Sequence, residues 1–187
     1  MRITCIAALL IASTSLTVSA QTARPERTPS PVVSNVPKAA ESDVASVDTI
    51  VRALYETISG PAGKPRDWNR LRSLFVPEGR MMPVGKHGQG EIRMRMMGVN
   101  DYIATSAPLI EEHGFNEREI SRREERFGNI AHVFTTYEAS TEIEPIHMRG
   151  INSIQLMNDG KRWWIVSLMW QAETPDVPLP KDYVPKD

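Results

Sequence analysis

Hydrophobic residues recur at every third or fourth position in the first half of the chain, a spacing typical of amphipathic helices. The pattern predicts helices over residues 43–59, 66–75 and 100–113. Ser42 is placed to cap the first helix, and glycine ends the first and the third. The apolar stripe of the first helix comprises Val44, Val47, Ile50, Val51, Leu54 and Ile58.

The second half of the chain alternates apolar and polar residues with a period of two, which predicts β-strands. Gly128-Asn129 and Asp159-Gly160 lie between such runs and predict hairpin turns. The predicted strands cover residues 117–127, 130–142, 147–157 and 161–172, after a short extended segment at 80–84. Helices followed by an antiparallel meander predict an α+β domain with its helices on one face of the sheet.

The last hairpin divides into two faces if Asp159-Gly160 is a two-residue turn. In that register Asn152 faces Ser167, and Gly150 faces Met169. Leu156, Trp163, Ile154 and Ile165 share this mostly apolar face, which predicts a core or a pocket against the helices. The opposite face carries two indoles, Trp164 and Trp170, and large indoles seldom face water in a row. That face therefore indicates a surface covered by another protein chain.

Both ends of the chain differ in composition from the middle. Residues 1–20 combine Arg2, a short apolar run and the small-residue triplet Val18-Ser19-Ala20, which predicts a signal peptide. The apolar run is too short to span a bilayer, so we expect no stable membrane span after cleavage. Residues 21–42 form a proline-rich segment that predicts a disordered linker, and 175–187 a proline-rich irregular tail. One folded domain is expected at 43–174.

The composition argues against several kinds of partner. The charged fraction of 24% and the hydrophobic fraction of 41% are those of an ordinary globular protein. The net charge is −1 without a block of like charges, so nothing indicates a nucleic-acid partner. Cys5, the only cysteine, belongs to the leader, and the histidines lack metal-ligand spacing. We therefore expect no disulfide, no metal and no cofactor.

Several short motifs occur in a characteristic order: Ala-Leu-Tyr on the first helix, Ser-Leu-Phe ending the second, Pro-x-Gly after a short strand, and Asp-Gly-x-x-Trp-x-Ile in the last strand. Together they resemble the nuclear transport factor 2-like superfamily, which includes ketosteroid isomerases, SnoaL-like polyketide cyclases and scytalone dehydratase. The resemblance covers residues 44–174 and extends to an exported bacterial subgroup without an assigned activity. It implies a cone: a curved antiparallel sheet around about three helices, with a cavity at the wide end and dimerisation through the outer sheet face.

The resemblance to the isomerases can be followed position by position. Their oxyanion tyrosine matches Tyr55, and their second oxyanion donor, an aspartate, matches Asn152. Their general-base aspartate precedes Pro-x-Gly, and here Met82 holds that position. A thioether cannot take a proton from carbon, which argues against steroid isomerisation by that mechanism.

Three functional classes remain open at this point. The leading one is a module that binds a small, neutral, hydrophobic ring-containing molecule without catalysis, since only hydroxyls and an amide are expected in the cavity. The second is an isomerase, cyclase or dehydratase, which needs a carboxylate or histidine there. The third is a structural dimeric partner protein, if side chains fill the cone. The expected cavity residues are Tyr55, Met82, Tyr102, Thr135, Tyr137, Asn152, Trp163, Ile165, Ser167 and Met169. The expected homodimer interface comprises His132, Phe134, Arg149, Ile151, Trp164, Val166, Leu168 and Trp170.

The leader predicts export to the periplasm or the medium, with cleavage after Ala20 and Gln21 as the new N-terminus. N-terminal sequencing of protein recovered from the cell envelope and from the medium checks this. A protein that begins at Met1 would contradict it.

Overall fold

The computed structural model describes residues 36–88 and 90–185. The predicted signal peptide and most of the predicted linker lie outside the described residues, so both assignments stay predictions, as does export. Within the described ranges, no helix has the length and apolar character needed to cross a membrane.

Four helices form in the part of the chain where helical spacing predicted them. They are α1 (Glu41–Val44), α2 (Val47–Ile58), α3 (Trp68–Leu74) and α4 (Val99–His113). The expectation that Ser42 caps the first long helix is wrong. The Ser46 hydroxyl accepts a hydrogen bond from the Thr49 amide at 3.1 Å, and the Thr49 hydroxyl accepts one from the Ser46 amide at 3.0 Å. This reciprocal capping box starts α2 at Val47 and leaves α1 as a separate single turn.

The strands form one curved sheet in the order β2-β1-β7-β6-β5-β4, with β3 paired to β1. Their bounds are β1 (Phe75–His87), β2 (Glu91–Met94), β3 (Met97–Gly98), β4 (Asn116–Phe127), β5 (Ile130–Ser140), β6 (His147–Asn158) and β7 (Trp163–Ala172). The predicted antiparallel meander of the last four strands is confirmed. The short extended segment expected at 80–84 is part of a longer strand, β1, which pairs parallel with β7 and makes the sheet mixed.

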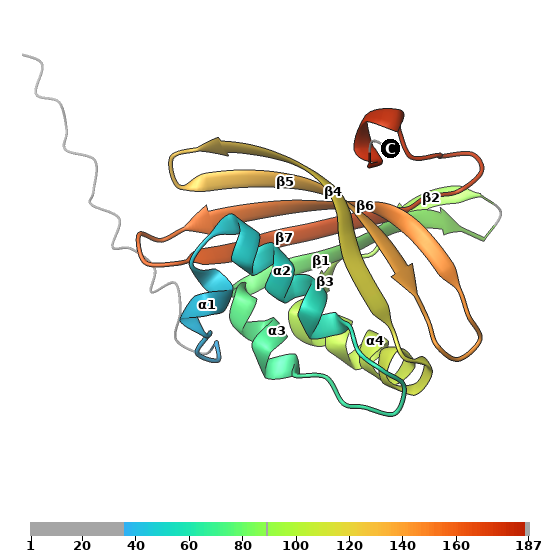
Figure 1. Cartoon of the computed structure of the whole chain (residues 1–187), viewed down its shortest axis with the longest axis horizontal. Coiled ribbons are helices and arrows are strands. Elements are labelled where there is room, and N and C mark those ends of the chain that lie inside the picture. Colours follow the sequence, from blue (N-terminus) through green and yellow to red (C-terminus); the bar gives the residue numbers. More distant parts are fainter. Residues whose placement is uncertain (1–35, 89, 186–187) are drawn as a thin grey trace, which may run out of the picture. The chain divides into compact units, whose positions relative to one another are not determined.

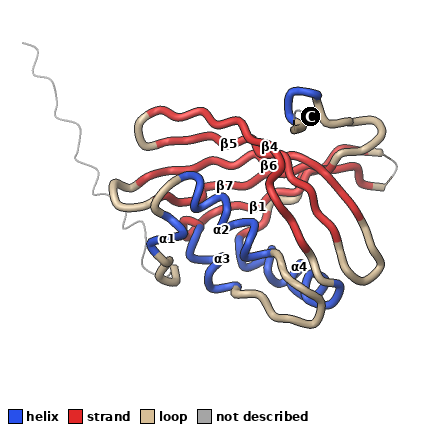
Figure 2. The backbone as a smooth tube through the Cα atoms, viewed as in Figure 1, coloured by secondary structure: helices blue, strands red, loops and turns tan. Residues whose placement is uncertain are grey.

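The helices cover the concave face of the sheet, as Figures 1 and 2 show. The α+β architecture with a sheet curved around N-terminal helices is therefore confirmed. Side chains from both layers interlock in a core that includes Ile50, Leu54, Leu71, Val133, Ile154 and Ile165.

The register expected for the last hairpin is wrong. The β6–β7 loop has four residues, because the Asp159 carboxylate accepts hydrogen bonds from the amides of Lys161 and Arg162 at 2.8 and 2.9 Å. Leu156 pairs with Ile165 and Gln155 with Ser167, so Val166 is an extra residue that bulges from β7. A bulge shifts the alternation by one, so every β7 side chain beyond it changes face.

Two of the residues expected at a dimer interface therefore face inward. Leu168 and Trp170 line the concave side, whereas Ser167 and Met169, expected in the cavity, lie on the outer face. The Trp164 indole does lie outside, but the chain covers it itself: Arg162 stacks 3.5 Å from the ring centroid, and Asp159 accepts its N–H at 2.8 Å. The two indoles thus give no argument for a partner chain.

The C-terminal tail covers another part of the outer face, on the side of the sheet away from the helices (Figure 1). Its single turn η1 (Lys181–Tyr183) brings the Tyr183 ring to 5.4 Å from the Phe134 ring, between centroids, and to 4.8 Å from the Arg123 guanidinium. The Thr136 hydroxyl donates to the Tyr183 carbonyl at 2.5 Å. His132, Phe134, Arg149, Ile151 and Val166 remain on this face, and the homodimer stays a prediction.

A buried arginine fixes the loop between α2 and α3 to α4. The Arg66 guanidinium donates to the carbonyls of Ile58, Pro61, Lys64, Gly60 and Ile110. Its amide donates to the Glu111 carboxylate at 3.0 Å. Removing the guanidinium leaves several of these carbonyls without a donor.

Arg66→Met should therefore lower the free energy of unfolding by about 2–4 kcal/mol. Urea unfolding followed by tryptophan fluorescence measures the change. Arg52→Met is the matched control, since the Arg52 side chain is 64% exposed and should change stability by less than about 0.5 kcal/mol. Equal stability of the two variants would contradict the structural role of Arg66.

Candidate functional site

A cavity of about 460 Å³ opens between the concave face of the sheet and the helices α2 and α4. Most of its wall is apolar, with Leu54, Ile58, Met81, Ile110, Phe115 and Leu168 among the lining residues. A volume of this size suits a small organic molecule. Side chains therefore do not fill the cone, which was the condition for the third functional class, a structural dimeric partner protein.

Three of the expected cavity residues line this space: Tyr102, Tyr137 and Asn152. The Tyr102 ring meets the Trp170 ring edge to face, with centroids 6.1 Å apart. Tyr137 lies opposite Gly150 on β6, where a Cβ would overlap the Tyr137 hydroxyl. The missing side chain at Gly150 thus makes room for the tyrosine. Burial raises the pKa of the Tyr102 and Tyr137 hydroxyls, so both are neutral donors at neutral pH.

The Asn152 amide connects the cavity to a chain of hydrogen bonds behind it. Its Nδ2 donates to Glu117 Oε1 and to the Tyr55 hydroxyl, both at 3.1 Å. The Thr135 hydroxyl gives its single proton to Glu119 Oε2 at 2.6 Å. Thr135 Oγ1 is therefore the acceptor in its 3.1 Å contact with the Tyr55 hydroxyl, and Tyr55 is the donor. The direction of every bond is fixed, which holds Asn152 in one orientation.

Glu117, on β4, is the residue that the sequence reasoning missed. We expected the cavity to hold only hydroxyls and an amide. That expectation is wrong, because Glu117 faces inward and lines the cavity with Tyr102, Tyr137 and Asn152. Burial raises the pKa of the Glu117 carboxyl to about 7 from an ordinary 4.5, although the hydrogen bond from Asn152 lowers it.

The backbone around Glu117 is tied to the end of α2. The Ser59 hydroxyl donates to the Glu117 carbonyl at 3.1 Å and accepts from the Glu117 amide at 2.9 Å. Gly60 and Phe115 exchange backbone hydrogen bonds one step away. The carboxyl is therefore carried by an edge strand that cannot shift independently of the helix.

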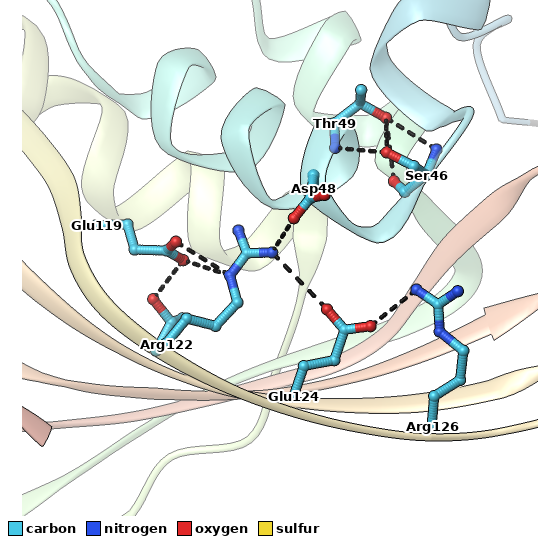
Figure 3. A network of polar contacts seen from close by, with 8 residues as sticks. Ser46, Asp48, Thr49, Glu119, Arg122, Glu124 and Arg126 are labelled. Atoms are coloured by element: carbon cyan, nitrogen blue, oxygen red, sulfur yellow. Dashed lines mark hydrogen bonds and ion pairs between the residues drawn. The ribbon is translucent and has the colours of Figure 1, made fainter. Parts of the chain in front are cut away.

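Further along β4, the inward-facing residues form an ion network (Figure 3). Arg122 donates to both oxygens of Glu119 at 3.0 Å and to Asp48 on α2 at 2.6 Å. Glu124 contacts Arg122 at 3.9 Å and Arg126 at 2.8 Å. Glu119 is thus paired with a guanidinium, whereas Glu117 receives its side-chain hydrogen bond from a neutral amide. The two carboxylates have different electrostatic surroundings although they lie two residues apart.

The remaining expected cavity residues lie elsewhere. Tyr55 and Thr135 lie directly behind Asn152 in the hydrogen-bond chain. Trp163 and Ile165 belong to the packed core. Met82 pairs with Met169 on the face away from the cavity, and its neighbour Met81 lines the cavity instead. Whether the cavity residues bind a ligand stays a prediction, and the described residues contain no cluster of three or more side chains suited to hold a metal ion.

No protein-family model and no curated protein matches the sequence. Solved structures do match the fold. Hexachlorocyclohexane dehydrochlorinase LinA-type3 from Novosphingobium barchaimii LL02 superposes with a TM-score of 0.55 at 12% identity, over 70% of this chain and 86% of that one. A candidate dehydratase from the NTF2-like family of Streptomyces avermitilis gives 0.52 at 14%, over 72% and 98%. A protein of unknown function with a cystatin-like fold from Nostoc punctiforme PCC 73102 gives 0.52 at 9%, over 73% and 94%.

These similarities establish the fold that the sequence motifs predicted. The chain has the nuclear transport factor 2-like, or cystatin-like, fold. At such low sequence identity the structural similarity establishes only the fold, and it does not assign the activities of those proteins to this chain.

The raised pKa of Glu117 predicts a specific dependence of stability on pH. The folded protein binds the Glu117 proton more tightly than the unfolded chain does. The contribution of this carboxyl to the free energy of unfolding is therefore fully present below about pH 4.5, and it is lost as the pH rises to about 7 and above. The free energy of unfolding of Glu117→Gln, relative to that of wild type, should therefore rise by about 2–3 kcal/mol when the pH is raised from about 5 to about 8. Urea unfolding at both pH values measures the difference.

The control is Glu138→Gln, which replaces a glutamate whose side chain is 42% exposed beside Arg118. Its stability difference from wild type should not change by more than about 0.5 kcal/mol over the same range. If Glu117→Gln follows the control, then the folded protein does not raise the pKa of the half-buried Glu117 carboxyl.

Proposed function

We propose that the protein is an enzyme that moves a proton on a small, largely apolar molecule, with Glu117 as the general base. The observation that carries the proposal is a carboxyl with a pKa near 7 in the wall of an apolar cavity. A carboxylate or histidine in the cavity is the feature that distinguishes an enzyme from a non-catalytic binding module. The Glu117 carboxyl in the cavity wall therefore favours an enzyme.

The chemistry expected of Glu117 follows from its surroundings. A base is most effective when its pKa lies near the working pH, because it is then ionised in part of the molecules and still basic enough to remove a proton. In water a glutamate is too weak for this, and burial makes it stronger. Asn152 donates to Oε1, which leaves Oε2 as the atom to take the proton.

The cavity also offers groups that stabilise negative charge. Tyr102 and Tyr137 carry neutral hydroxyls in the same cavity as Glu117. A hydroxyl held in an apolar site donates to an oxygen that gains negative charge when a proton leaves the neighbouring carbon. Base and donors together suit isomerisation or elimination next to a carbonyl group, and they do not require a metal ion.

This arrangement differs from the one that the family resemblance implied. There the base would precede Pro-x-Gly, at Met82, and Tyr55 would donate to the substrate oxygen. Here Tyr55 donates within the protein to Thr135, and the carboxyl comes from β4. A non-catalytic binding module remains the second candidate, favoured by the apolar wall alone.

A generic carbon acid tests for the base without knowledge of the natural substrate. Nitrobenzisoxazole is flat and apolar, and it opens to a coloured phenolate when a base removes its carbon-bound proton. We expect the wild-type protein to accelerate this reaction, with kcat/KM rising as Glu117 loses its proton near pH 7. Glu117→Gln should lower kcat/KM by about 100-fold or more.

Two variants separate a base from a passive apolar pocket. Glu138→Gln should keep the wild-type rate, because Glu138 pairs with Arg118 outside the cavity. Asn152→Leu removes the hydrogen bond that lowers the pKa of Glu117, so the midpoint of its pH–rate profile should move to higher pH. A rate that persists in Glu117→Gln would remove the enzyme proposal and leave the binding module.

A further inference from the structure

The mouth of the cavity carries large aliphatic side chains that are exposed to solvent. Leu109 on α4 is 61% exposed, and Ile143 and Ile146 in the β5–β6 loop are 50% and 53% exposed. All three line the same cavity as Glu117. We call these three residues the apolar collar. Exposed leucines and isoleucines are ordinary when scattered, but a group that continues an apolar cavity to the surface indicates a contact surface.

The collar is held in place by the backbone. The amides of Glu142 and Ile143 donate to the His113 carbonyl at the end of α4, at 3.0 and 2.9 Å. Thr141 closes the loop on itself: its hydroxyl donates to the Glu144 carbonyl and accepts from the Ile146 amide, both at 3.0 Å. Figure 1 shows this loop and the end of α4 at the same edge of the molecule. The isoleucines are therefore fixed at the mouth, on a loop that is hydrogen-bonded within itself and to α4.

A ring-containing molecule confined to the cavity would leave the collar in water. We propose that the substrate is an amphiphile: an oxygenated head lies at Glu117 and Tyr137, and an unbranched aliphatic tail leaves through the mouth across Leu109, Ile143 and Ile146. The proposal rests on the proposed function for the position of the head. The tail is assigned by the continuity of the apolar wall from Ile110 and Met148 inside to the collar outside.

The carboxylates near the mouth disfavour a tail with an anionic end. Glu144 lines the cavity next to Ile143, and Glu142 accepts a hydrogen bond from the Ala62 amide at 3.0 Å close by. A negative group at this end of the ligand would meet both carboxylates. The ligand class is accordingly a neutral long-chain carbonyl compound rather than a fatty acid bound with its carboxylate outward.

Calorimetric titration with straight-chain methyl ketones, from about eight to about fourteen carbons, tests the collar directly. Each methylene that leaves water should raise affinity roughly threefold to fourfold, and the gain should continue through the longest chains that the collar can cover. In the triple variant Leu109→Ser, Ile143→Ser, Ile146→Ser, the shortest ketone should bind as in wild type and the longest should lose about tenfold or more. Ile92→Ser is the control, since Ile92 is 61% exposed on β2 and does not line the cavity.

Three results would overturn the collar as a tail site. Wild type could stop gaining affinity at short chains, or the triple variant could keep the full chain-length dependence. Light scattering could instead show that wild type is a dimer and the triple variant a monomer, in which case a second copy of the chain covers the collar. Glu117→Gln should bind the ketone series with unchanged chain-length dependence while it loses proton abstraction, so failure of the tail site and failure of the base are distinguishable.

Discussion

The two hydrogens of a single amide group hold the candidate site together. Asn152 gives one to Glu117 and the other to Tyr55, so it joins a cavity carboxyl to a buried chain that ends at Glu119 and Arg122. Buried polar groups are stable only when they are paired, and this chain pairs each of its members. The carboxyl at its cavity end receives one neutral donor, which is too little to restore the hydration lost on burial. That imbalance is the physical source of its raised pKa.

Elements governed by local periodicity could be predicted from the sequence. The stripe from Val47 to Ile58 and the meander from β4 to β7 follow directly from helical spacing and alternation. The placement of side chains along β7 could not, because Val166 is an extra residue in the ladder and reverses the alternation after it. Valine is an ordinary strand residue, so the sequence carries no sign of the bulge. Hence Trp170 and Met169 exchanged their expected faces.

Glu117 escaped prediction for a related reason. It begins a stretch of alternating charges on β4, and such a stretch is usually solvated. In the fold, Ile120 bulges from this strand. The charged residues that face inward are Glu117 and Glu119 before the bulge and Arg122 and Glu124 after it. Their partners, Asn152 and Asp48, lie far away in the sequence, so local patterns could not reveal them. Tyr102, Tyr137 and Asn152 were predictable as cavity residues because no bulge separates them from the pattern that placed them.

The proposed activity depends on one property, a carboxyl at position 117 that holds its proton to near neutral pH. Carbon-13 NMR of protein labelled at the glutamate carboxyl carbon measures it directly, with Glu117→Gln identifying the signal. We predict one glutamate resonance that titrates near pH 7 and is absent from the variant. If the resonance lost in Glu117→Gln titrates near the ordinary value of 4.5 instead, the carboxyl is solvated and cannot serve as the base that the cavity requires.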